Sequence, residues 1–131
     1  MPGYTIVNLV DDVEDMAPRF GYAPQMQSRF ARVPLGLERS GVSLFRIAPG
    51  FRVPFGHRHG EQEEVYVVVR GSARMKLGAD VVELRQWDAV RIAPETERGL
   101  EAGPDGLELI AFGAPNTENR DAEMLPGFWP E

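Results

Sequence analysis

The two histidines of this 131-residue chain, His57 and His59, stand two residues apart, and the sequence contains no others. In an extended strand the side chains at positions i and i+2 point to the same face, so two imidazoles at this spacing can share one metal ion. Glu64 follows closely and can supply a third ligand from the next strand. If that strand slips by one residue, Glu63 becomes the alternative ligand, because neighbouring side chains face opposite ways.

Composition restricts what else could do chemistry. The chain has no cysteine, which excludes disulfides, thiol nucleophiles and thiolate metal sites. Its net charge of -6 argues against a nucleic-acid partner, because such binding needs a basic face. No apolar stretch reaches the roughly 18 residues of a membrane span, and no signal-peptide pattern opens the chain. We therefore expect no membrane partner and a cytoplasmic location.

The elements that must position these side chains show the pattern of short strands and turns that is typical of an all-β domain. Short apolar runs alternate with turns from residue 41 onward, and the expected strands are 42–47, 52–59, 65–69, 73–77, 81–84, 88–92, 99–102 and 107–112. Gly71 is expected to end a strand, and residues 103–106 are expected to form a turn. Many short strands at this spacing favour an antiparallel sandwich or barrel.

The strand-rich region divides the chain into three segments. Residues 1–40 are expected to form an irregular N-terminal arm with a short strand at 4–10 and a short helix at 25–32. Residues 41–113 form the barrel, and residues 114–131 form a C-terminal tail that packs on the barrel or on a dimer partner. Phe128 and Trp129 are too apolar to be left in water, which is one reason to expect a homodimer.

The spacing around the histidines resembles the first motif of the cupin superfamily. That motif consists of a glycine, a His-x-His pair, a glutamate and a closing glycine, here Gly50, His57, His59, Glu64 and Gly71. The resemblance covers residues 42–112. It implies an antiparallel double-stranded β-helix, also called a jelly roll, in a single domain. It says little about activity, because this fold hosts enzymes, storage proteins and sensors alike.

The second cupin motif is degenerate in this chain. Trp87 and Glu95 stand where the resemblance calls for glycines, and Arg98 stands where it calls for a fourth, histidine ligand. The resemblance therefore implies metal binding only for His57, His59 and Glu64.

Arg98 leaves two interpretations open. In one, the two histidines and the glutamate hold a divalent ion with open coordination positions, and iron, manganese, nickel and zinc are not distinguished. Arg98 would then hold an anionic group of the substrate. In the other, Arg98 pairs with Glu64, and the cavity binds an organic anion without a metal.

We expect the cavity to be apolar, as ligand pockets generally are, with Phe45, Phe55, Tyr66 and Met75 as substrate-binding candidates on its wall. Trp87 is expected to pack at a barrel end. The leading functional hypothesis is a metal-dependent oxygenase or isomerase that acts on a small, anionic organic molecule. The alternatives are a metal-free protein that binds or senses a small molecule, and a structural protein with a vestigial cavity.

Overall fold

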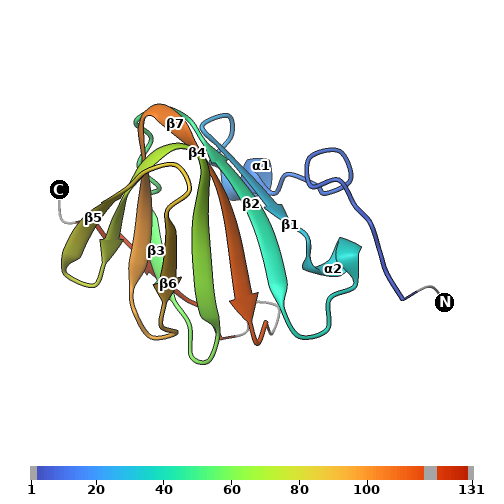
Figure 1. Ribbon diagram of the computed structural model, residues 1–131. Coiled ribbons are helices and arrows are strands. Elements are labelled where there is room, and N and C mark those ends of the chain that lie inside the picture. Colours follow the sequence, from blue (N-terminus) through green and yellow to red (C-terminus); the bar gives the residue numbers. More distant parts are fainter. Residues whose placement is uncertain (1–2, 117–120, 130–131) are drawn as a thin grey trace.

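The chain folds into a curled antiparallel sheet that closes on itself, which confirms the expected all-β barrel (Figure 1). The structure is a computed structural model and describes residues 3–116 and 121–129. The elements in these ranges are α1 Ala17–Phe20, β1 Met26–Phe30, α2 Arg32–Leu35, β2 Gly41–Ile47, β3 Phe55–Arg58, β4 Glu63–Leu77, β5 Asp80–Leu84, β6 Ala89–Ile92, β7 Arg98–Ala114 and β8 Glu123–Pro126. No helix among these residues is long and apolar enough to cross a membrane.

Two long strands, β4 and β7, build the barrel by pairing along most of their length. The first half of β4 also pairs with β6 and its second half with β5, while β7 pairs with β2 and touches β3. β1 extends the sheet beyond β2, and β8 lies beside β3. Both long strands therefore bend from one layer of the jelly roll into the other (Figure 1).

Glycine at the bend explains why two expected strand ends are absent. Gly71 does not end a strand, because β4 continues through it with a shift of register. Its φ of 78° suits glycine, and a side chain there would collide with the carbonyl of Gly106. Residues 103–106 likewise bulge within β7 and do not separate two strands. The glycines thus mark corners of continuous strands.

The N-terminal arm differs from both of its expected elements. Residues 25–32 are not a helix: Met26–Phe30 forms β1, antiparallel to β2, and buries Met26 and Ser28. Pairing with an existing strand overrides weak helix propensity. Residues 4–10 form no strand, and Ile6 is exposed. The two short helices lie beside β1, on the side of the barrel away from β5 (Figure 1).

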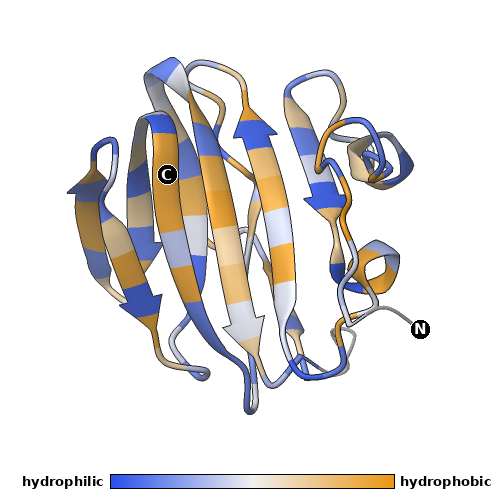
Figure 2. Cartoon of the chain, turned by 45° about the vertical axis from the view of Figure 1, so that its right-hand side comes forward, coloured by the Kyte–Doolittle hydropathy of each residue, from blue (hydrophilic) through white to orange (hydrophobic). Residues whose placement is uncertain are grey.

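Alternating hydropathy along the strands places the core inside the barrel (Figure 2). Val68, Met75 and Leu109 have no exposed surface. The tail also packs on its own chain, because Trp129 is buried and the Arg52 guanidinium lies 4.2 Å from the centre of its ring. Trp87 does not pack at a barrel end as expected, since it is 67% exposed.

Candidate metal centre

The barrel brings the two histidines and Glu64 to one place. His57 lies in β3 and His59 directly follows that strand, so their rings share a face and lie 5.0 Å apart. Glu64 is the second residue of β4 and is buried, whereas its neighbour Glu63 points outward and pairs with Arg91 at 2.9 Å. The register therefore selects Glu64, and Glu63 lies on the opposite side of the strand.

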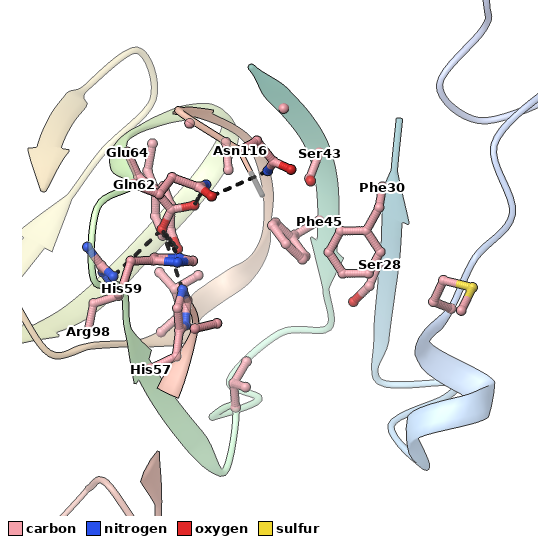
Figure 3. Close-up of a pocket in the computed structure, with 18 of the residues that line it drawn as sticks. Ser28, Phe30, Ser43, Phe45, His57, His59, Gln62, Glu64, Arg98 and Asn116 are labelled. Atoms are coloured by element: carbon pink, nitrogen blue, oxygen red, sulfur yellow. Dashed lines mark hydrogen bonds and ion pairs between the residues drawn. The ribbon is translucent and has the colours of Figure 1, made fainter. Parts of the chain in front are cut away.

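The ligand atoms of these three residues converge (Figure 3). Nε2 of His57 and Nε2 of His59 each lie 3.4 Å from Oε1 of Glu64, and the three groups offer ligand atoms within 4.8 Å of one another. Two ligands that bind one metal ion at about 2.1 Å lie roughly 3.0 to 3.4 Å apart in octahedral or tetrahedral geometry. Within residues 3–116 and 121–129, nothing makes a hydrogen bond with the buried Nε2 of His59. The three residues fit a divalent ion.

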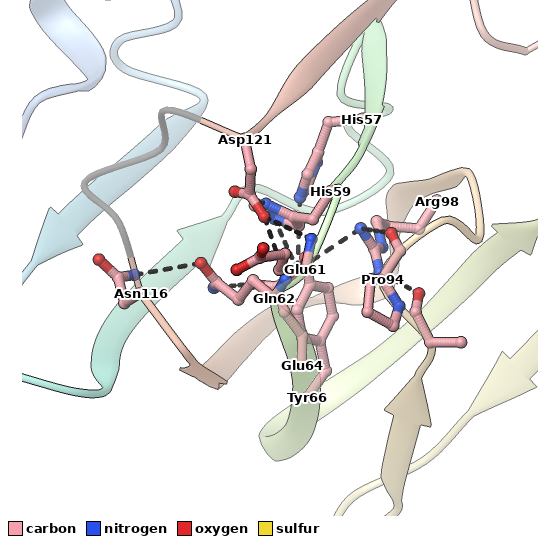
Figure 4. Close-up of polar contacts among 11 residues, drawn as sticks. His57, His59, Glu61, Gln62, Glu64, Tyr66, Pro94, Arg98, Asn116 and Asp121 are labelled. Carbon is pink, nitrogen blue, oxygen red and sulfur yellow. Dashed lines mark hydrogen bonds and ion pairs between the residues drawn. The ribbon is translucent and has the colours of Figure 1, made fainter.

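Polar neighbours hold Glu64 by hydrogen bonds. The sequence analysis named one of them, Tyr66, but as a residue of the cavity wall and not as a partner of Glu64. The Tyr66 hydroxyl donates to Oε1 of Glu64 at 3.3 Å, and the Gln62 amide donates to Oε2 at 3.3 Å. Asn116 in turn donates to Gln62 at 3.3 Å (Figure 4). Gln62 is buried above Gly113, where a side chain would collide with the Gln62 amide.

Asp121 is the other residue that sequence reasoning missed. Its Oδ1 lies 3.0 Å from Nδ1 of His59, and its Oδ2 accepts hydrogen bonds from the backbone N–H groups of Glu61 and Gln62 (Figure 4). A carboxylate behind a metal-binding imidazole is a common arrangement, because it orients the ring. The contact joins parts of the chain 62 residues apart, and no local pattern predicts it.

Arg98 reaches the site from the first position of β7, opposite His57 in the neighbouring strand. Only 1% of it is exposed, and its guanidinium donates to the backbone carbonyls of Ala93 and Pro94 at 2.9 and 3.4 Å. Oε1 of Glu64 is 3.9 Å away, too far for a hydrogen bond. Arg98 is thus fixed by backbone carbonyls and makes only a long ion pair with Glu64.

The charges of the cluster follow from these contacts. Burial raises the pKa of Glu64, but His57 and His59 outweigh it and lower the pKa to about 2. Burial likewise raises the pKa of Asp121, but the backbone N–H of Glu61 and the ring of His59 lower it to about 2. Burial also raises the pKa of the Tyr66 hydroxyl well above its usual value. Both acids are therefore carboxylates at neutral pH, and Tyr66 remains a hydrogen-bond donor.

The pKa of His59 is the result of opposing effects. Burial lowers it, but the carboxylates of Glu64 and Asp121 outweigh burial and raise it above the usual value. The site therefore attracts positive charge at the position where the ligand atoms converge.

A cavity of about 770 Å³ opens from this cluster toward the N-terminal arm. Phe45, Phe55, Tyr66 and Arg98 line it, as do Ser28 and Ser43 at its far end (Figure 3). Met75 is not part of the wall. It lies in the core, in the half of β4 beyond Gly71, so its assignment as a substrate-binding residue is corrected.

Comparison with known proteins identifies the fold. A cupin protein from Bacteroides fragilis has a TM-score of 0.72 with 23% identity, over 89% of this chain and 88% of that one. The polyketide cyclase RemF from Streptomyces resistomycificus has a TM-score of 0.73 with 21% identity, over 95% of this chain and 86% of that one. The expected cupin fold, a double-stranded β-helix, is confirmed.

Sequence comparison adds little about activity. No model of a protein family matches the chain. An uncharacterised protein of Methanocaldococcus jannaschii is 29% identical over 70 residues, which is 53% of this chain and 56% of that protein. The match thus spans little more than half the length of that relative, and the site must carry the functional argument.

Proposed function

We propose that this cupin-fold protein is a metal-dependent enzyme that acts on a planar, largely apolar organic anion. His57, His59 and Glu64 hold the divalent ion, and the reaction is of the oxygenase or isomerase type. The observation that carries the proposal is the convergence of three ligand atoms at the inner end of an apolar cavity, with both imidazole nitrogens 3.4 Å from one carboxylate oxygen.

The ligand set supports this assignment chemically. Two imidazoles and one carboxylate occupy one side of a metal ion and leave positions open for a substrate. A bound divalent ion supplies Lewis acidity that polarises a substrate oxygen. The protein's own residues fix the carboxylate: Tyr66 and Gln62 hold Glu64 by hydrogen bonds. The chain has no cysteine, and among the described residues no serine hydroxyl is hydrogen-bonded to the cluster, so we do not invoke a covalent intermediate.

The charge of the wall favours an anion. Among the described residues, Glu64 is the one carboxylate that lines the cavity, against two guanidiniums, those of Arg32 and Arg98. Beside the cluster the Arg98 guanidinium offsets the Glu64 carboxylate, so a divalent ion held there would leave an excess of positive charge. Arg98 lies beside the cluster and is held there by Ala93 and Pro94, which positions it to orient an anionic group.

The size and walls of the cavity favour a planar, apolar body. A volume of about 770 Å³ accommodates a molecule of several rings, and aromatic side chains such as Phe45 and Phe55 line it. The structurally similar RemF is a polyketide cyclase. We take 2-naphthoate as a probe of this class, with the neutral 2-naphthamide as its uncharged counterpart.

The metal is tested first, on protein purified without a His-tag. We expect one equivalent of Fe(II), Mn(II), Ni(II) or Zn(II) after reconstitution, measured by elemental analysis. Metal well below one equivalent for all four ions would overturn the metalloenzyme proposal. Binding of 2-naphthoate by that metal-free protein would then support a binding or sensing role, and no binding would support a structural one.

The anion is tested by calorimetric titration of the metal-loaded protein. We expect 2-naphthoate to bind at least about tenfold more tightly than 2-naphthamide, a difference of roughly 1.4 kcal/mol. Arg98→Gln should remove most of this preference, because it removes the buried charge. Equal affinity for the two probes would refute the anionic substrate class. Turnover that consumes oxygen would mark an oxygenase, and turnover without oxygen an isomerase.

A further inference from the structure

Asp121 determines which nitrogen of His59 can bind a metal. A neutral imidazole carries its proton on one of two ring nitrogens. Oδ2 of Asp121 accepts hydrogen bonds from two backbone N–H groups, an arrangement that favours the carboxylate, and its Oδ1 lies 3.0 Å from Nδ1 of His59, where it can only accept. The proton therefore resides on Nδ1. Nε2 then carries the free lone pair, and it lies 3.4 Å from Oε1 of Glu64, on the side where the ligand atoms converge.

His57 differs from His59 in how its ring is held. Its Nδ1 makes no hydrogen bond with any residue in the described ranges 3–116 and 121–129. Its side chain is 24% exposed, against 3% for His59. The two imidazoles of the pair are thus held differently, and the geometry of the ligand set depends more on His59.

The same carboxylate also acts on a second ligand through the backbone. Oδ2 of Asp121 accepts hydrogen bonds from the N–H groups of Glu61 and Gln62 at 2.8 and 3.0 Å. The Gln62 side chain then donates to Oε2 of Glu64. One residue from the C-terminal segment thus positions two of the three ligands.

The C-terminal segment that carries Asp121 is docked on the strand of the histidines. β8 pairs with β3 along its whole length, so that Met124 lies opposite His57. Outside the cavity, Arg58 and Glu123 form an ion pair at 2.6 Å. Asp121 is therefore placed behind His59 by the docking of β8 on β3, although the two residues lie 62 positions apart in sequence.

We propose that Asp121 is the positioning residue of the metal centre and sets its affinity by holding His59 in the Nδ1–H tautomer. This inference rests on the proposed metal binding for its functional consequence. The tautomer itself exists in the metal-free protein, and it can be tested there.

Asp121→Asn is the decisive variant, because it keeps the shape of the side chain. The two backbone N–H groups require an acceptor, so the amide oxygen of the asparagine will face Glu61 and Gln62. Its NH₂ group will then face Nδ1 of His59 and donate to it. The imidazole proton is forced onto Nε2, the ligand atom. An equivalent change of tautomer accounts for the large loss of activity when the aspartate of a serine-protease triad becomes asparagine.

Zinc affinity is measured by competition with a chelating dye for the wild type, Asp121→Asn, Asp121→Ala and Glu123→Ala. We expect both Asp121 variants to lose about 10- to 100-fold in affinity, the usual range for such partners. Glu123→Ala removes a carboxylate from the same segment without touching the histidines and should stay within about 3-fold of the wild type, since exposed pairs contribute little. Wild-type affinity in Asp121→Asn would overturn the inference.

A second measurement follows the protons directly. The chain has only two histidines, so long-range ¹H–¹⁵N spectra resolve both rings. In metal-free wild type, at a pH where the rings are neutral, we expect His59 as the Nδ1–H tautomer, and in Asp121→Asn as the Nε2–H tautomer. An unchanged tautomer would refute the positioning role. If the wild type does not bind zinc, the proposed function is refuted. The tautomer of His59 in the metal-free protein would still decide whether Asp121 orients that ring.

Discussion

The two ends of the cavity are built in different ways. At the inner end, buried polar side chains hold one another: His59 is 4% exposed and Glu64 is 8% exposed, and both have fixed partners. The outer end is built by the N-terminal arm, where Phe20 is 53% and Val33 is 75% exposed although both line the cavity. One end is mostly buried and hydrogen-bonded, whereas the other is apolar and open.

This difference assigns separate tasks to the two ends. Metal ligands must be held in one geometry, which requires partners such as Asp121 behind them. An apolar wall can select a ligand by area and shape, and it tolerates small changes. Changes at the inner end should therefore abolish metal binding, and changes at the outer end should alter ligand affinity only.

The largest effect is expected from removing a ligand at the inner end. His59→Ala or Glu64→Ala should weaken zinc binding by more than about 100-fold, because even the loss of an orienting partner costs 10- to 100-fold. Zinc at 1,000 times the wild-type dissociation constant should stabilise the wild type by about 4.1 kcal/mol and these variants by at most about 1.4 kcal/mol. Thermal unfolding with and without zinc measures this. Equal stabilisation of wild type and Glu64→Ala would place the metal elsewhere.

A large effect on stability alone is expected in the core between the two ends. Met75 is fully buried and does not line the cavity, so Met75→Ala should lower the free energy of unfolding by about 2–5 kcal/mol. Its zinc affinity should equal that of the wild type. Denaturant unfolding measures the loss, and Met124→Ala at a half-exposed position should cost much less. A loss of ligand binding in Met75→Ala without a loss of stability would show that Met75 contacts the ligand.

The sequence predicted the inner end better than the outer end. The i, i+2 spacing of His57 and His59 and the position of Glu64 before an apolar strand are local patterns, and local patterns survive folding. Arg98 was found because the cupin motif has a histidine there. Asp121 was not found, because its contact with His59 depends on how a distant segment docks, and no periodicity encodes that.

The N-terminal arm, which builds the outer end, was mispredicted because tertiary pairing decides its structure. Residues 25–32 lack a strong local preference, and β1 forms there because β2 offers its edge. The Met75 side chain points into the core, as the alternation of a strand predicts, but the bend at Gly71 separates its half of β4 from the half that reaches the metal centre.

The homodimer stays a prediction, and light scattering at micromolar concentration tests it.

At the outer end, Phe45→Ala should weaken the binding of 2-naphthoate by roughly tenfold, which corresponds to about 1.4 kcal/mol of lost aromatic burial. Phe45 packs edge-on against Phe30 with ring centres 5.8 Å apart, inside the cavity. Zinc affinity should not change. Phe112→Ala is the matched control, since Phe112 is 48% exposed and does not line the cavity. A drop in zinc affinity for Phe45→Ala would mean that the two ends are coupled.

A smaller effect, in the stabilising direction, is expected at Trp87. This residue has a φ of 73°, which strains a non-glycine backbone by about 1–2 kcal/mol. It stands where the cupin motif has glycine, and it is largely exposed. Trp87→Gly should therefore raise the free energy of unfolding by about 0.5–1 kcal/mol, because the greater freedom of the unfolded glycine chain offsets part of the relief. Trp87→Ala keeps the strain and should show no such gain, and zinc affinity should be unchanged in both.

The smallest effect is expected from Glu63, the residue beside the ligand Glu64. Its side chain is 53% exposed and pairs with Arg91, which is 66% exposed, and such surface pairs contribute between about 0 and 1 kcal/mol. Glu63→Ala should therefore change neither stability nor zinc affinity measurably, whereas Glu64→Ala removes metal binding. The two variants delete the same chemical group one residue apart. The difference in zinc affinity between them shows how much metal binding depends on the direction of the side chain, because only that direction differs. A loss of zinc binding in Glu63→Ala would show that the strand adopts the other register when metal is present.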